Sequence, residues 1–249
     1  MGVERYLRER IGQQHTIHMT LIDPEITGPT KSGMVAKEAE DGGTTAIMVG
    51  SSTLASNSDL DEVVKGIKKS VKVPVILFPN NVSGVSRHAD AIWFMSLLNS
   101  SNPYYIIDVQ ALTASLIRQY GLETLSMGYI IVGDGGAAGF VGHARPISYE
   151  HPELASGYGL AAEMLGMHFV YLEAGSGAKR PVPPEVIKLV KGQLKVPLIV
   201  GGGIRDGASA RVAAMAGADV IVTGTLIEET DRVREKIKEI VDNIINIEK

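Results

Sequence analysis

Eight short apolar segments recur along the chain, and they constrain the fold more than any other feature of the sequence. They lie at Thr16–Ile22, Thr45–Val49, Val75–Phe78, Ala91–Met95, Met127–Val132, Phe169–Glu173, Leu198–Val200 and Val220–Thr223. Several are continuous apolar runs, which is typical of parallel strands that are covered on both faces. Strands that alternate with helices form either a doubly wound sheet or a closed barrel. The count of eight and the length of 249 residues favour an α/β fold of the (β/α)8 type, the TIM barrel, which takes about 250 residues.

The segments between these strands have the apolar spacing of helices. They are Ser32–Asp41, Leu60–Val71, Tyr104–Tyr120, Pro152–Leu165, Pro184–Leu194 and Ala208–Ala216. The connection from Pro79 to Asp90 is too short for a full crossover helix with its loops. We therefore expect an irregular third βα unit that leaves a groove on the outer wall. No linker interrupts the pattern, so residues 1–249 are expected to form a single domain.

A last helix is predicted from Leu226 to about Ile247. Its apolar residues recur at helical spacing and form one stripe. They are Val233, Ile237, Ile240, Val241, Ile244 and Ile245. We expect this stripe to pack on the barrel or on a neighbouring subunit, with membrane contact as the minor alternative.

Composition excludes several classes of function. The net charge of −4 does not supply the basic field that nucleic-acid binding requires, so no nucleic-acid partner is expected. The absence of cysteine excludes disulfides, thiol nucleophiles and Cys-ligated metals, and fits a cytoplasmic protein. No apolar run reaches the roughly 20 residues of a membrane helix. The protein is therefore expected to be soluble and not membrane-spanning.

Glycine turns follow both of the last two predicted strands. The first is Gly201-Gly202-Gly203-Ile204-Arg205-Asp206, and the second is Gly224-Thr225. Glycine lets backbone N–H groups approach an anion closely, and a helix N-terminus adds free donors. Barrel enzymes often bind phosphate in the loops after strands seven and eight. Because glycine turns occupy both positions, we predict a phosphate site there rather than two purely structural turns.

A carboxylate ends the sixth predicted strand. Alternation along the strand places Tyr171 and Glu173 on the same side, and we expect both to point towards the barrel axis. Gly175-Ser176-Gly177 then adds N–H groups and a hydroxyl beside the phosphate site. A carboxylate in this position can hold a substrate hydroxyl, or act as a general base if its pKa is raised. The alternative is a structural, ion-paired Glu173.

Hard oxygen ligands follow the first two predicted strands. Asp23 precedes Pro24, and Ser52 lies just after the second strand. Mg²⁺ in proteins typically takes one or two carboxylates and completes its shell with water and substrate phosphates. Asp23 and Ser52 are therefore the candidate metal ligands, with a turn residue before Pro24 as the lesser alternative for Asp23.

Taken together, these motifs resemble one enzyme family. Leu21-Ile22-Asp23-Pro24, Tyr171-Leu172-Glu173-Ala174-Gly175-Ser176-Gly177, Gly201-Gly202-Gly203-Ile204-Arg205 and Gly224-Thr225 stand in the order seen in geranylgeranylglyceryl phosphate synthases. The segment from Tyr171 to Gly177 is the most specific part of the resemblance. The chain length and the stretch Gly133–His151 resemble the larger subgroup of this archaeal family, whose members are often oligomeric.

The resemblance implies a reaction and a role for each motif. The C3 hydroxyl of sn-glycerol 1-phosphate attacks C1 of geranylgeranyl diphosphate, and diphosphate leaves as the ether bond of an archaeal lipid forms. Asp23 and Ser52 would hold Mg²⁺ on the diphosphate, and Glu173, with Tyr171 beside it, would act on the attacking hydroxyl. Glycerol phosphate would be bound by Tyr171, Leu172, Glu173, Ala174, Gly175, Ser176, Gly177, Gly202, Gly203, Gly224 and Thr225. The resemblance also implies a homo-oligomer.

The prenyl tail would need an apolar trench. The irregular third unit and Ile92-Trp93-Phe94-Met95 could contribute to it, although Trp93 fits a plain core residue at least as well. Rival interpretations are a phosphate-binding isomerase or lyase of amino-acid biosynthesis, with Asp23 and Asp134 as an acidic pair, and a non-catalytic phospholigand-binding barrel. Mg²⁺ dependence and release of diphosphate discriminate among these functions.

Overall fold

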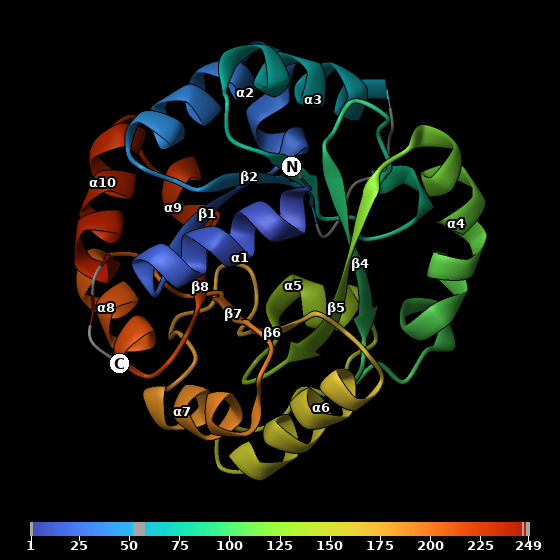
Figure 1. Ribbon diagram of the computed structural model, residues 1–249, viewed down its shortest axis with the longest axis vertical. Coiled ribbons are helices and arrows are strands. Elements are labelled where there is room, and N and C mark those ends of the chain that lie inside the picture. Colours follow the sequence, from blue (N-terminus) through green and yellow to red (C-terminus); the bar gives the residue numbers. More distant parts are fainter. Residues whose placement is uncertain (1, 52–57, 246, 248–249) are drawn as a thin grey trace.

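The eight parallel strands close into a barrel in chain order, each paired with its neighbours in sequence and β1 with β8 (Figure 1). The computed structural model describes residues 2–51, 58–245 and 247. The strands are β1 Ile17–Ile22, β2 Ala46–Val49, β3 Val75–Leu77, β4 Ala91–Leu97, β5 Glu123–Ile131, β6 Phe169–Glu173, β7 Leu198–Gly201 and β8 Val220–Thr223. The predicted TIM barrel is therefore confirmed. Its parallel pairing puts the C-terminal ends of all eight strands, which lead into the βα loops, on one rim, where barrel enzymes place their sites.

Helices lie around and in front of the strands in Figure 1, most of them in an outer ring. They are α1 Val3–Gln14, α2 Pro24–Asp41, α3 Ser58–Ser70, α4 Val109–Tyr120, α5 Gly136–Val141, α6 Pro152–Met164, α7 Pro184–Gln193, α8 Gly207–Met215, α9 Thr225–Glu228 and α10 Val233–Ile244. A π-helical turn, Tyr104–Asp108, precedes α4. Helix α2 begins earlier than the predicted Ser32, because Asp23 caps it and Pro24 occupies its first turn. The chain kinks at Gly28, which has a φ of 65°.

The third βα unit is irregular, as predicted. Between β3 and β4, a segment that the structure describes throughout, the only helical element is the 3-10 turn Val82–Gly84. Strands β3 and β4 pair over only Ile76↔Ala91 and Leu77↔Ile92. No helix of full length therefore covers this part of the barrel wall, and side chains of β4 remain open to a groove beside α4.

The predicted final helix is wrong in its continuity. Helix α9 stops at Glu228 and α10 begins at Val233. The break follows from local hydrogen bonding, because the Thr230 hydroxyl accepts the backbone N–H of Arg232 at 3.0 Å, a turn that competes with helix formation.

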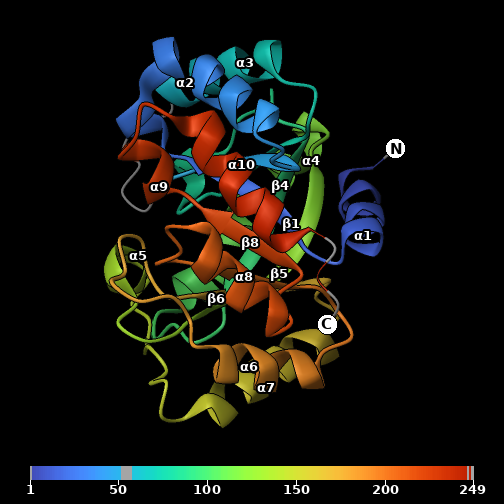
Figure 2. The ribbon, with the colours of Figure 1, turned by 90° about the vertical axis from the view of Figure 1, so that its left-hand side faces the viewer.

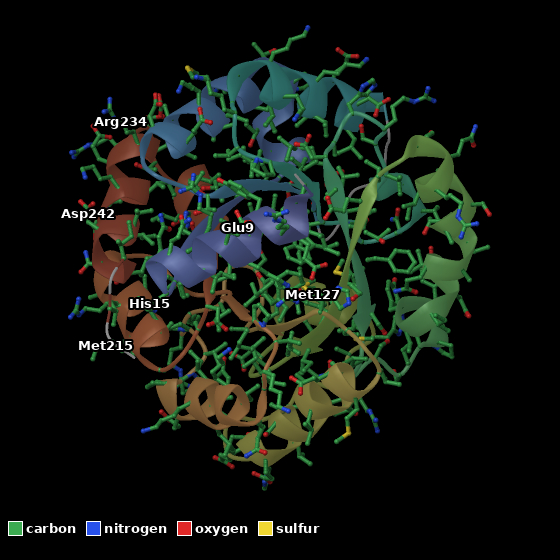
Figure 3. All side chains as sticks on the ribbon, viewed as in Figure 1. Glu9, His15, Met127, Met215, Arg234 and Asp242 are labelled. Atoms are coloured by element: carbon green, nitrogen blue, oxygen red, sulfur yellow. The ribbon has the colours of Figure 1, made fainter. Side chains whose placement is uncertain are left out.

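The apolar stripe of α10 is buried in the protein's own helix layer. Val233, Ile237, Ile240, Val241 and Ile244 are buried, and Figure 3 shows Arg234 and Asp242 on the outer side of the same helix. The stripe thus packs on the barrel, which was the main expectation. Among the described residues, no helix is long and apolar enough to cross a membrane.

Helix α1 covers one end of the barrel. It crosses in front of the strands in Figure 1 and lies on the opposite side from α5 and α9 in Figure 2. The Glu123 carboxylate holds its N-terminus by accepting the N–H groups of Val3, at 2.5 Å, and Glu4, at 2.9 Å. The free N–H groups of a helix N-terminus favour such a carboxylate. Access to the interior is therefore from the rim opposite α1.

Candidate active site

Glu173 lies at the end of β6 with its carboxyl buried at the open rim. Its residue exposure is 7%, and its Oε1 accepts the backbone N–H of Gly175 at 2.6 Å. The phenols of Tyr129 and Tyr171 line the same cavity as this carboxyl and favour its charged form. Burial raises the pKa of Glu173 to about 7, although the Gly175 N–H and the two phenols oppose the rise. A carboxyl poised near neutral pH can accept a proton from a substrate hydroxyl.

A small polar cavity lies beside Glu173 at the ends of β6, β7 and β8. It brings together most of the residues predicted to bind glycerol phosphate. These are Tyr171, Glu173, Ser176, Gly177, Gly202, Gly203, Gly224 and Thr225. Arg205 also lines the cavity and adds a positive charge at its edge, where its Nη1 lies 3.6 Å from Glu229 Oε2. N–H groups, hydroxyls and one guanidinium are the donors that a phosphate group requires.

Glycine is needed at the first glycine turn for geometric reasons. Gly202 and Gly203 have φ angles of 84° and 74°, which side chains other than glycine rarely adopt. A Cβ on Gly202 would lie 2.5 Å from Glu173 Oε1. The turn after β7 therefore packs directly against the carboxyl, and the glycines bring the two loops into contact.

Three of the predicted binding residues do not line this cavity. Leu172 and Ala174 are buried on the opposite face of the strand, in the core between strands and helices. Gly175 contributes its N–H to Glu173 instead, and its α-carbon packs on the backbone of Gly135 and Gly136. These residues support the loop, whereas Tyr171 and Glu173 face the barrel axis as alternation predicts.

A larger, mainly apolar groove opens on the same rim and runs to the irregular third unit. Its lining comes from the ends of β1 to β5, from α4 and from α5. It includes Phe78, Val85, Ile92, Trp93, Phe94, Met95, Leu97, Tyr105, Val109, Thr113, Ile117, Ala138 and Val141. Trp93 fills both roles proposed for it, because it lines the groove and also packs edge-on against Phe169, with ring centroids 5.1 Å apart.

Two carboxyl side chains lie where the groove meets the ends of β1 and β8. Asp23 caps α2 by accepting the N–H of Glu25 at 2.8 Å, and it lines the groove together with Glu228. Partial desolvation of the carboxyl, with the charges of Asp23 and Glu229, raises the pKa of Glu228. Within the part of the chain that the structure describes, no basic side chain pairs with either carboxyl group, and two such carboxylates suit a hard divalent cation. Ser52, the other predicted ligand, lies outside the described residues.

Sequence reasoning missed three residues of this rim. Tyr129 on β5 and Phe78 after β3 line both cavities, and Glu228 stands near Asp23. Alternation from Met127 along the fifth strand could have found Tyr129. Phe78 and Glu228 carry no motif of their own, because their places depend on how distant loops meet.

Comparison with known proteins places the chain in a family. The model of the PcrB family matches residues 5–244. The chain belongs to the PcrB family. Among its relatives, the geranylgeranylglyceryl phosphate synthase of Thermofilum pendens is 53% identical over 96% of this chain and 93% of its own. The synthase of Pyrococcus abyssi is 52% identical, and the match covers 96% of both chains.

A solved structure agrees with this PcrB-family assignment. The (S)-3-O-geranylgeranylglyceryl phosphate synthase of Thermoplasma acidophilum, in complex with the substrate sn-glycerol 1-phosphate, is 40% identical. It superposes with a TM-score of 0.94 and covers 99% of this chain and 100% of its own. The resemblance to geranylgeranylglyceryl phosphate synthases deduced from the motifs is thus confirmed.

Proposed function

We propose that this protein joins the C3 hydroxyl of sn-glycerol 1-phosphate to the geranylgeranyl group of geranylgeranyl diphosphate, releasing diphosphate. The observation that carries the proposal is the meeting of two unlike cavities on one rim. A polar cavity suited to a phosphate and an apolar groove suited to a prenyl tail share Leu21, Phe78, Tyr129 and Thr225. Phosphate and tail belong to different substrates in this reaction, so the shared wall is where the ether bond would form.

The residues divide the chemistry between them. The loops after β6, β7 and β8 fix the acceptor by its phosphate, which makes the attack effectively intramolecular. Glu173 takes the proton of the C3 hydroxyl as its oxygen bonds to C1 of the donor. The bond from C1 to the diphosphate oxygen breaks, and its electron pair leaves with diphosphate. The apolar groove holds the tail away from water.

The proposal includes a magnesium ion. Asp23, with Glu228 near it, fits an Mg²⁺ site that the diphosphate completes, and Ser52 remains the second proposed ligand. When bound, Mg²⁺ supplies positive charge that stabilises the leaving diphosphate. Asp23 holds this position because the start of α2 fixes its carboxylate through the N–H of Glu25.

We also propose that the protein is a homo-oligomer and that it is located in the cytoplasm. The apolar stripe of α10 is occupied within the chain, so it does not support an interface. Support comes instead from large apolar side chains at the surface, among which Phe140 on α5 is 86% exposed and Met164 on α6 is 77% exposed. Such side chains mark protein contacts when they gather into patches.

Diphosphate release from the purified protein tests the activity. sn-Glycerol 1-phosphate and geranylgeranyl diphosphate are supplied with Mg²⁺ or with a chelator, and either substrate is omitted as a control. Release that needs Mg²⁺ and both substrates supports the proposal. Binding of glycerol phosphate without any release would support a non-catalytic barrel. The isomerase alternative has no support from its acidic pair, because Asp134 is exposed and lies outside the residues lining either cavity.

A further inference from the structure

Tyr129 stands between the two cavities. It lies on β5 opposite Tyr171 in the sheet register, and its side chain is buried on the inner face of the barrel with an exposure of 6%. It lines both the polar cavity and the apolar groove, whereas Tyr171 lines only the polar one. Tyr129 is therefore the phenol placed to touch both reaction partners.

Aromatic packing fixes the direction of the Tyr129 ring. The ring meets Phe78 edge-on at 86° and 5.6 Å between centroids, and it meets Tyr171 edge-on at 77° and 5.2 Å. Phe78 and Tyr171 are themselves stacked, with an interplanar angle of 21°. Such contacts hold rings in defined orientations. With its ring held in this way, Tyr129 lines the same polar cavity as the Glu173 carboxyl, and the charge of that carboxyl helps to raise the pKa of the Tyr129 phenol.

We infer that Tyr129 is a positioning residue for Glu173, holding the carboxyl towards the acceptor at the point where the prenyl donor arrives. This inference rests on the proposed function and adds a residue to it. In the attack, the Glu173 carboxylate accepts the C3 hydroxyl proton while diphosphate leaves with the electron pair of the broken bond. The Tyr129 phenol keeps its own proton throughout and donates one hydrogen bond to a carboxyl oxygen of Glu173.

Few groups face the Glu173 carboxyl, so the effect of Tyr129 on its pKa can be measured. From its own strand and loop come Tyr171 and the Gly175 N–H, and from β5 comes Tyr129. Burial and the charge of Glu173 raise the pKa of Tyr129 well above the usual value of 10, so the phenol stays protonated as a donor. Arg205 lies at the edge of the same cavity.

Tyr149 provides a control, because the charge of Glu173 affects its pKa although no hydrogen bond to Glu173 is involved. Burial, with the charges of Asp134 and Glu173, raises the pKa of Tyr149 to about 12, against the opposing charge of Arg180. No hydrogen bond to Glu173 contributes to that shift.

The test is the pH dependence of kcat/KM for glycerol phosphate in wild type, Tyr129→Phe and the matched control Tyr149→Phe. In wild type the acid limb should lie near pH 7, since ionised Glu173 is required. Loss of the Tyr129 donor should move the limb up by about one pH unit, lowering kcat/KM about tenfold below the limb. Tyr149→Phe should leave the limb in place. The substrate phosphate titrates identically in all three proteins.

A second substitution guards against misfolding of Tyr129→Phe. 3-Fluorotyrosine at position 129 keeps the ring and hydroxyl but donates more strongly, so the acid limb should move down. Titration of the Glu173 carboxyl by difference infrared spectroscopy, with Glu173→Gln to assign the band, should show the same shifts without turnover. An unchanged limb and an unchanged infrared midpoint in both substituted proteins would overturn the positioning role. Absence of diphosphate release from wild type would instead overturn the proposed function.

Discussion

Replacing Glu173 by glutamine should abolish turnover and at the same time stabilise the protein at alkaline pH. Between pH 4.5 and about 7 the folded state retains a proton on Glu173 that the unfolded chain has lost. Stability of the wild type therefore falls as pH rises through this window. At about 1.4 kcal/mol per pH unit, the buried carboxylate costs at most about 3 kcal/mol above pH 7. Glutamine carries no charge, so its variant escapes this cost.

Urea unfolding of wild type and Glu173→Gln at about pH 4 and about pH 8 measures the effect. The two proteins should be almost equally stable at the acid value. At the alkaline value the variant should be more stable by up to about 3 kcal/mol. Glu150→Gln, which neutralises an exposed carboxylate, is the control and should change little at either pH. Equal stability of Glu173→Gln and wild type at about pH 8 would refute the reasoning, because Glu173 would then ionise without penalty.

Three further predictions address the polar cavity, the metal and the groove. Gly202→Ala should raise KM for glycerol phosphate at least about tenfold, measured by initial rates, because its Cβ would lie 2.5 Å from Glu173 Oε1 in a backbone with φ of 84°. Asp23→Asn should raise the Mg²⁺ concentration for half-maximal activity about tenfold, measured by metal titration, with no change in glycerol phosphate binding. Thr113→Trp, in the groove wall, should slow reaction with geranylgeranyl diphosphate more than with shorter prenyl donors, which competition between donors would show.

The barrel was predictable because its signals are local. Short apolar runs, several of them continuous, mark β1 to β8, and the short Pro79–Asp90 connection predicted the irregular third unit. The same local logic put Tyr171 and Glu173 on one face of β6. Prediction from local pattern failed at the last helix, which is interrupted by a turn in which the Thr230 hydroxyl accepts the N–H of Arg232. The apolar spacing of the segment does not indicate that hydrogen bond.

The site was predictable only in part, for a related reason. Glycine turns and a strand-end carboxylate have residue types that indicate chemistry by themselves. Tyr129 and Phe78 gain their places from the closure of the barrel, which brings Phe78, just after β3, into ring contact with residues of β5 and β6. Leu172 and Ala174 show the converse, since they belong to the specific motif yet face the helices.

The missing helix beside β3 and β4 has a thermodynamic consequence. Most strands of the barrel are covered by a helix of the same chain, which contributes apolar burial to the folded state. At the third unit a prenyl tail would take the place of that helix and complete the hydrophobic layer. The donor would then act as a removable part of the core, and its binding would stabilise the folded protein by an amount that rises with the logarithm of the donor concentration. At the third unit, binding of the prenyl donor would therefore also complete the hydrophobic layer of the barrel.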